Sequence, residues 1–256
     1  MKRLFVIALV LAGCRAVKTQ RVEAIAGGTA STLSGDLSFR ADGLTGTASF
    51  NDLGLDGVQS FPVLGLAFDA SQWFLDLTYQ DWMRRGTGII TTPLEFDGTQ
   101  FLANTRVRSD LRMTRWDQRV GSWLGQKGDL KWGLVANLSQ YFLEGRLTST
   151  GGVTPPGVAL VFDVDFPMLA VGPIVELRRK TWSAGMSLTG LGGSIEDHKY
   201  TTVDATAHVA WTLHPHHMIG LATGWRRLSV DAPLDGERAL VDWEQPMFQI
   251  SWRCAF

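Results

Sequence analysis

The sequence predicts an all-β fold: one antiparallel up-and-down transmembrane β-barrel of about ten strands, with eight or twelve strands as alternatives. Three observations support this. The chain ends, from Gln245 to Phe256, in residues that alternate apolar and polar, which puts the two kinds on opposite faces of a strand. The same alternation recurs along the chain. The stretches between these segments are alternately long and short, as in barrels whose loops are long on one membrane face and short on the other.

Composition agrees with this fold. The 256 residues leave room for one large all-β domain, and the formal net charge of -1 offers no basic surface for nucleic acid. The 28 glycines and 10 tryptophans suit turns and membrane-interface aromatics. No stretch after the N-terminus approaches the roughly 18 consecutive apolar residues of a membrane helix. A closed barrel is the other structure that satisfies its backbone hydrogen bonds in lipid.

The N-terminal segment is predicted to be a targeting signal. A basic start, Met1-Lys2-Arg3, precedes a short apolar run. The sequence Leu11-Ala12-Gly13-Cys14 then resembles a bacterial lipobox, which implies cleavage before Cys14 and lipidation of its thiol. An ordinary signal peptide cut after Ala16 is the alternative.

The domain prediction follows from this segment: a lipoprotein-type signal peptide at 1–13, a tether at 14–29 and the barrel at 30–256. The chain has two cysteines. Because Cys14 would be acylated and Cys254 would face lipid, no disulfide is expected.

The ten expected strands lie at about 31–40, 58–69, 72–83, 104–124, 130–144, 161–178, 182–189, 200–213, 217–230 and 241–256. Long loops are expected at 41–57, 86–103, 145–160, 190–199 and 231–240, and short turns between the other pairs. The fourth strand is irregular, since Leu111 and Met113 have the opposite parity to Trp116 and Val120. A β-bulge near Thr114-Arg115 would restore its register.

The last strand carries the second resemblance. Its outward series ends in the apolar residues Phe248, Ile250, Trp252 and Phe256. This resembles the carboxy-terminal assembly signal of bacterial outer-membrane β-barrel proteins. That class implies a Gram-negative outer membrane, contact with its lipid and lipopolysaccharide, and insertion by the barrel assembly machinery. It further implies periplasmic termini and extracellular loops; a monomer is expected.

The inward positions are expected to form a charge network in the lumen, because isolated buried charges are costly. Asp36 and Gln249 are also expected to face inward, and Arg253 to neutralise Glu176 or Asp36. The charges nearest the turns (Asp117, Arg119, Glu176, Arg178 and Arg253) should share one layer. The predicted network consists of Asp76, Asp117, Arg119, Glu176, Arg178, Asp204, His208, Arg226 and Arg253.

Several groups invite a chemical interpretation. Asp197-His198 at a loop mouth is similar to the acidic residues and histidine at the rim of omptin proteases, although no further omptin motif is evident. His208 with Ser183 or Ser187 and Glu176 could imitate the set of a lipid A deacylase, if hydrogen-bond distances allowed it.

Two more clusters have simpler alternatives. His214, His216 and His217 crowd one turn, where solvated histidines are favoured over a metal site. The arginines at 106, 108, 112 and 115 could touch lipopolysaccharide phosphates, but pairing with acids such as Glu95 and Asp97 is favoured.

The leading functional hypothesis is therefore a non-enzymatic barrel that is structural or binds through its loops, with a lumen plugged by ion pairs. The alternatives are a narrow porin-like channel for small polar solutes and, third, a lipid- or peptide-hydrolysing membrane enzyme. Neither a cofactor nor a metal is predicted, nor a nucleic-acid partner.

Overall fold

The protein was analysed as a computed structural model, which describes residues 21–41, 44–96, 99–195, 198–234 and 237–256. These residues contain no helix that is long and apolar enough to cross a membrane. The strands are β1 (Arg21–Ser31), β2 (Ser34–Ala41), β3 (Leu44–Ser49), β4 (Gln59–Asp69), β5 (Trp73–Ile90), β6 (Leu94–Phe96), β7 (Thr99–Phe101), β8 (Thr105–Lys127), β9 (Leu130–Gly151), β10 (Ala159–Arg178), β11 (Trp182–Ile195), β12 (His198–His214), β13 (His217–Leu234) and β14 (Glu237–Ala255).

The main sheet closes into a barrel. Antiparallel neighbours follow the order β1-β4-β5-β8-β9-β10-β11-β12-β13-β14, and β14 returns to pair with β1. β2 continues the line of β1 and pairs with the other half of β14, so β1 and β2 form one interrupted strand. β3 is a short arm on β2, and β6 and β7 form a separate small hairpin. The predicted ten-stranded, up-and-down barrel is therefore confirmed for the described residues.

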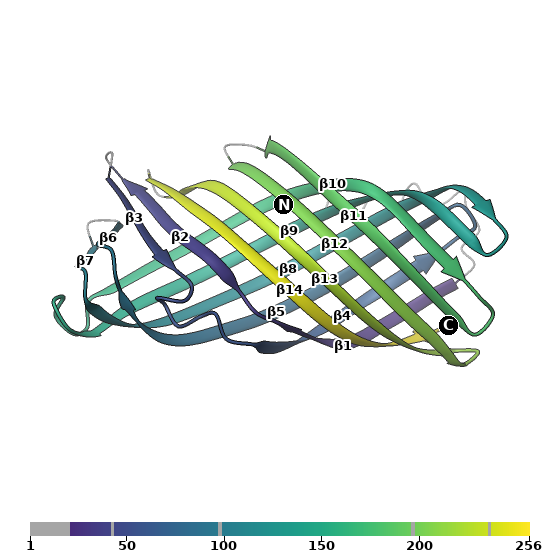
Figure 1. Cartoon of the computed structure of the whole chain (residues 1–256), viewed down its shortest axis with the longest axis horizontal. Helices are drawn as coiled ribbons and strands as arrows, with labels where there is room; N and C mark the ends of the chain where they lie inside the picture. Colours follow the sequence, from purple (N-terminus) through teal and green to yellow (C-terminus); the bar gives the residue numbers. More distant parts are fainter. Residues whose placement is uncertain (1–20, 42–43, 97–98, 196–197, 235–236) are drawn as a thin grey trace.

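The strands are strongly inclined to the barrel axis (Figure 1). The register passes from Val22 through every strand of the barrel and returns to the first strand at Ser34, twelve residues further along. A ten-stranded barrel with this stagger has strands tilted by about 40°. Inward positions on strands far apart in sequence can therefore lie at the same height.

The outer surface divides into two zones. The four short connections (70–72, 128–129, 179–181 and 215–216) define a turn end, and the opposite end is called the loop end. Near the turn end the outward residues include five tryptophans, and halfway along the strands lie three further aromatics, Tyr79, Trp116 and Trp225. No described outward residue between these groups is charged. The five tryptophans are Trp73, Trp132, Trp182, Trp211 and Trp252.

This apolar band has the aromatic borders of a membrane-spanning surface. Beyond the band, toward the loop end, the outward residues become charged. They include pairs such as Arg112 with Asp81, at 2.8 Å, and Arg85 with Asp110, at 3.2 Å. The loop end therefore has the outer surface of a protein in water.

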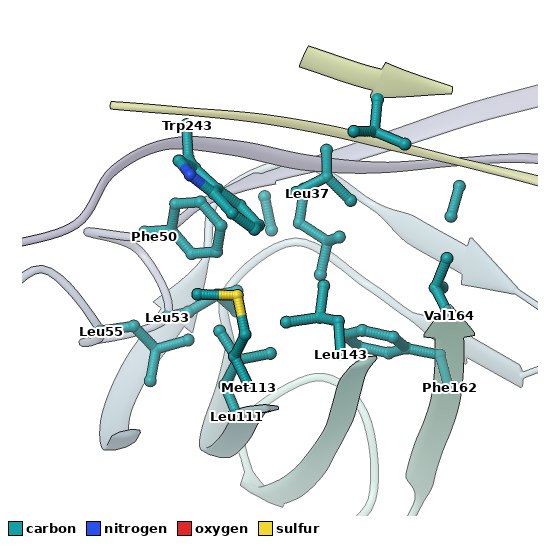
Figure 2. Close-up of a cluster of buried hydrophobic side chains, with 14 of the residues drawn as sticks. Leu37, Phe50, Leu53, Leu55, Leu111, Met113, Leu143, Phe162, Val164 and Trp243 are labelled. Atoms are coloured by element: carbon teal, nitrogen blue, oxygen red, sulfur yellow. The ribbon is translucent and has the colours of Figure 1, made fainter. Parts of the chain in front are cut away.

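The interior divides in the opposite sense. At the level of the apolar band most inward side chains are polar, apart from a small cluster of Phe74, Val135 and Ile174. The inside of the loop end is filled by a large apolar cluster, here called the plug. Figure 2 shows part of this plug, in which residues from β2, β8, β9, β10, β14 and the segment 50–57 meet. The labelled residues are Leu37, Phe50, Leu53, Leu55, Leu111, Met113, Leu143, Phe162, Val164 and Trp243.

The segment 50–57 folds back into the barrel mouth and forms one wall of the plug. Its backbone lies so close to β5 that a Cβ atom at Gly86 or Gly88 would overlap a carbonyl oxygen of the segment. Arg84, which is 1% exposed, donates to the carbonyl oxygens of Leu55 at 3.0 Å and Gly57 at 2.5 Å. The close approach that Gly86 and Gly88 allow and the buried guanidinium of Arg84 thus hold the segment in place.

Three expectations about strand geometry were wrong. Residues 21–29 belong to β1, which pairs with β4 and β14, and not to a tether. Leu33, Leu37 and Phe39 lie in the plug, which turns Asp36 outward. No bulge occurs at Thr114-Arg115.

The register of β8 shifts only near its two ends, so the change of parity has another cause. Leu111 and Met113 face the plug, while Trp116 and Val120 face outward from the apolar band. Most of the expected long loops are in fact extensions of strands beyond the band. β5 runs to Ile90 and β9 runs to Gly151.

Candidate functional site

The polar half of the lumen holds most of the buried charge of the described residues and is the candidate site. At its loop-end limit lies a layer of two buried ion pairs, here called the ion-pair layer (Arg115, Asp117, Tyr141, Asp204 and Arg226). Arg226 donates through Nε to Asp204 at 2.8 Å and through Nη1 to the Tyr141 hydroxyl at 3.0 Å. All of these side chains are less than one tenth exposed.

The second pair of the layer stands on β8. Arg115 contacts Asp117, whose other carboxylate oxygen accepts a hydrogen bond from Ser139 at 2.5 Å. The Arg115 guanidinium lies 5.6 Å from the centre of the Tyr141 ring, and that ring stacks on Phe166 at 5.0 Å. Tyr141 therefore joins the charged layer to the plug, and together they close the lumen toward the loop end.

Below the ion-pair layer the lumen is hollow. A cavity of about 350 Å³, here called the vestibule, extends from this layer to residues of the turns, including the exposed Arg179 and Lys180. Within it, Arg119 donates to the Ser187 hydroxyl at 3.0 Å and lies 3.8 Å from the Asp76 carboxylate. The vestibule is thus a polar pocket that is closed on one side and reaches the surface at the turn end.

A third group of charges surrounds the vestibule opening. Arg178 lies 2.6 Å from Asp69 and 3.1 Å from Glu176. On the other side Glu23 contacts Arg21 at 2.7 Å and Arg253 at 3.5 Å. The Arg253–Glu23 pair joins the neighbouring strands β14 and β1, whereas the Arg178–Asp69 pair joins β10 to β4, which are not neighbours in the sheet.

The nine residues predicted to form the network all line the vestibule. The five that were expected to share one layer do not share it. Asp117 lies far along β8 from the turn at 128–129, whereas Arg178 lies next to the turn at 179–181. Arg253 pairs with Glu23, not with Glu176 or Asp36. Glu23 was missed because its segment was assigned to the tether, although Glu23 and Ile25 already alternate with Ala24 and Ala26.

The catalytic arrangement proposed for His208 is not assembled. Its ring lies against Gly185, where a Cβ atom would approach Cε1 to 2.7 Å. Among the described residues, His208 makes no hydrogen bond to Ser183, Ser187 or Glu176. Instead, Ser187 is hydrogen-bonded to Arg119 and Thr206.

The other candidate residues do not assemble into a site among the described residues. The described residues contain no group of three or more His, Cys, Asp or Glu side chains placed to hold a metal ion. At the turn of the histidines, His216 contacts the carbonyl oxygen of Ala255 at 3.2 Å and His217 stacks on Trp252 at 5.5 Å. Cys254 is a free thiol, while Cys14 and Asp197 lie outside the described residues.

The arginine run of β8 does not act as a unit. Arg115 points inward into the ion-pair layer, whereas Arg108 and Arg112 face outward. Arg108 lies 3.6 Å from Asp110, and Arg112 binds Asp81 through two nitrogen atoms. The acids that pair with these two arginines therefore belong to strands, not to the loop acids expected from the sequence.

The closing strand has the predicted orientation. Phe248, Ile250, Trp252 and Phe256 are 46% to 81% exposed on the outward side, and Gln245 and Ser251 are buried inside. The outward placement of the predicted assembly residues is thus confirmed, while their recognition by an assembly machinery stays a prediction.

Comparison with known proteins supports the fold. No protein-family model matches the chain, and no curated protein matches it. Among solved structures, the outer membrane protease OmpT from Escherichia coli matches with a TM-score of 0.60 at 12% identity, over 94% of this chain and 98% of that chain. The translocator domain of the autotransporter NalP from Neisseria meningitidis gives a TM-score of 0.41 at 11% identity, over 100% and 95%. The chain therefore has the fold of an outer-membrane β-barrel.

Proposed function

We propose that the protein is a non-conducting β-barrel of the bacterial outer membrane, without enzymatic activity, that works through the surfaces it presents on either side of the membrane. The observation that carries this proposal is the closed lumen. Any solute path along the axis meets the ion-pair layer and then the plug. Both are buried, and the plug consists almost entirely of apolar side chains, which cannot replace the hydration of a solute.

In this proposal the band between the aromatic groups spans the bilayer. The loop end is extracellular and the turn end periplasmic, since long loops and short turns have this distribution in such barrels. Acylation of Cys14 would then anchor the N-terminus in the inner leaflet. Incorporation of labelled palmitate, lost in Cys14→Ala, tests this part of the proposal.

Planar-bilayer recording tests the closed lumen. The purified barrel is expected to show no stepwise conductance in concentrated salt. A variant with a smaller plug, for example Phe162→Ala with Leu143→Ala and Trp243→Ala, still has the ion-pair layer. It should therefore admit ions only if that layer also opens. Steady conductance of the unmodified protein, in a preparation with a heat-modifiable gel shift, would refute the proposal.

The outer face of the loop end is the expected contact for lipopolysaccharide. Arg106 and Arg146 are exposed there, beyond the apolar band. Charge-assisted bonds to phosphate would suit such arginines. Co-purification of lipopolysaccharide that falls in Arg106→Gln with Arg146→Gln would support this contact, and unchanged retention would oppose it.

A peptide-hydrolysing function is the second candidate, because a similar structure with a TM-score of 0.60 is a protease. The lumen of the loop end speaks against it: the buried inward positions described within the plug carry neither a carboxylate nor an imidazole. Cleavage of a peptide library by the purified barrel, abolished in His198→Ala, would overturn the non-enzymatic proposal.

A further inference from the structure

We infer that the vestibule binds a small soluble oxyanion, a carboxylate or a phosphate, through Arg119 and Arg253 next to His208. This site depends on the vestibule alone, so binding and conductance are separate measurements. It gives the otherwise closed lumen a ligand-binding role at the turn end.

The first argument is the charge of the pocket. Of the described residues, eight basic and six acidic side chains line the vestibule. Because one of the basic residues, Arg179, pairs at 3.0 Å with Asp129 outside the lining, the surplus is one positive charge. The two pairs of the ion-pair layer are internally neutral, so the surplus lies among the residues nearer the opening. A concave pocket with a surplus of one sign raises the local concentration of the opposite ion.

The second argument is the incomplete pairing of two arginines. Arg119 lies 3.8 Å from Asp76, and Arg253 lies 3.5 Å from Glu23, whereas Arg226 donates to Asp204 at 2.8 Å. The Nε atom of Arg253 is also buried and has no hydrogen-bond partner among the described residues. An unmade bond of a buried charged group is costly. An oxyanion at this position would supply it.

The third argument is the position of His208. It lies within electrostatic reach of Arg253 and Arg119. No hydrogen bond joins its imidazole to another described residue of the network. Its ring occupies the space that the absent side chain of Gly185 leaves free. An imidazole N–H next to two guanidinium groups completes a set of donors for carboxylate or phosphate oxygens.

The cavity has a suitable size. Its 350 Å³ lies at the lower end of the range of small-molecule sites, about 300–1,000 Å³. Because the ion-pair layer ends the cavity, the ligand enters and leaves at the turn end. Asp76 and Glu176 also line the pocket, which disfavours ligands of high negative charge and favours those with one or two charges.

The test uses the full-length barrel folded in a non-ionic detergent at low ionic strength. Inorganic phosphate and succinate are titrated by calorimetry, and the Cε1–H resonance of His208, assigned with His208→Gln, is followed by NMR. The cation 1,4-diaminobutane is the matched probe of opposite charge. Both anions are expected to shift the His208 resonance and to bind about tenfold more weakly in Arg119→Gln and in Arg253→Gln.

Arg85→Gln is the control variant, because Arg85 lies on the outer surface, paired with Asp110 and away from the lumen, and it should leave binding unchanged. Folding of each variant is checked by its heat-modifiable gel shift. If Arg119→Gln fails to fold, Arg119→Lys, which keeps the charge but loses the planar fork, should still weaken binding. Absence of any shift at roughly 20 mM anion, tighter binding of the diamine, or equal weakening in Arg85→Gln would each overturn the inference.

Discussion

Removing Asp204 is expected to destabilise the barrel strongly, because its partner Arg226 would remain buried. Arg226 is 4% exposed and would keep only the Tyr141 hydroxyl, at 3.0 Å, as a hydrogen-bond partner. Breaking a buried ion pair costs about 3–5 kcal/mol. Since Arg226 lines the vestibule and water can approach it there, we expect about 3 kcal/mol for Asp204→Ala.

The assay is urea unfolding of the folded barrel in detergent, followed by tryptophan fluorescence and by the gel shift. The double variant Asp204→Leu with Arg226→Met removes both charges and should recover most of the lost stability, since apolar replacements of a buried pair are often neutral. Asp81→Ala, which breaks the exposed pair with Arg112, should change the midpoint much less. A loss under about 1 kcal/mol for Asp204→Ala, or a double variant as unstable as the single one, would refute the reasoning.

Two further predictions concern the loop end. In Gly88→Ala the new Cβ atom would overlap the carbonyl oxygen of Asp52, so the segment 50–57 should leave the mouth and become cleavable by added protease. Gly28→Ala, where the nearest atom to the new Cβ is 3.9 Å away, should stay resistant to the protease. Equal resistance of both variants would contradict this packing. Asp163 lies outward beyond the apolar band, where partial burial first, and then the charges of Glu144 and Asp165, raise the pKa of its carboxyl above the usual value. Its ionisation therefore opposes folding above that pKa, so Asp163→Asn should raise the melting temperature at pH 7. The gain in melting temperature should vanish as the pH falls below about 4, the pKa of the carboxyl in the unfolded chain. A gain that persists in acid would exclude this cause.

The barrel and its strand number follow from features that the sequence displays directly. Alternation at Trp132, Leu134 and Ala136, or at Phe248 and Ile250, has one meaning wherever lipid lies outside and a polar lumen inside. The position of the charge network also follows, because parity alone assigns Asp204 and Arg226 to the interior.

The other features of the fold depended on where, along each strand, the outer surface changes from apolar to charged. Leu111 and Met113 have the parity of lumen residues but the character of lipid-facing ones, and a bulge seemed the simplest explanation. The actual cause is tertiary: beyond the apolar band, water lies outside and the plug inside, so the pattern inverts without any break in the register. A sequence periodicity of two reports a difference between faces but does not tell which face is in water.

The expected single layer of charges failed because its members stand at different distances from their turns. Asp117 and Asp204 lie far along their strands from the turns at 128–129 and 215–216, whereas Arg178 lies next to the turn at 179–181. Glu23 illustrates a different limit, because the small residues around it at Gly27 and Gly28 resemble a linker, although they pair on both sides in the barrel.

The interrupted first strand has a consequence for how the barrel is completed during folding. Elsewhere in the barrel each strand pairs with a near neighbour in sequence, but β14 must find β1 and β2, whose paired residues precede it by 198 to 232 positions. Such distant pairings carry the largest loop-closure cost and are expected to form late. The gap at residues 32–33 divides the pairing with β14 into two separate ladders. The ladder with β1, nearer the turn end, and the ladder with β2, beside the plug, can therefore form independently. Hydrogen exchange should therefore find different opening rates for the amides of β14 that face β1 and those that face β2.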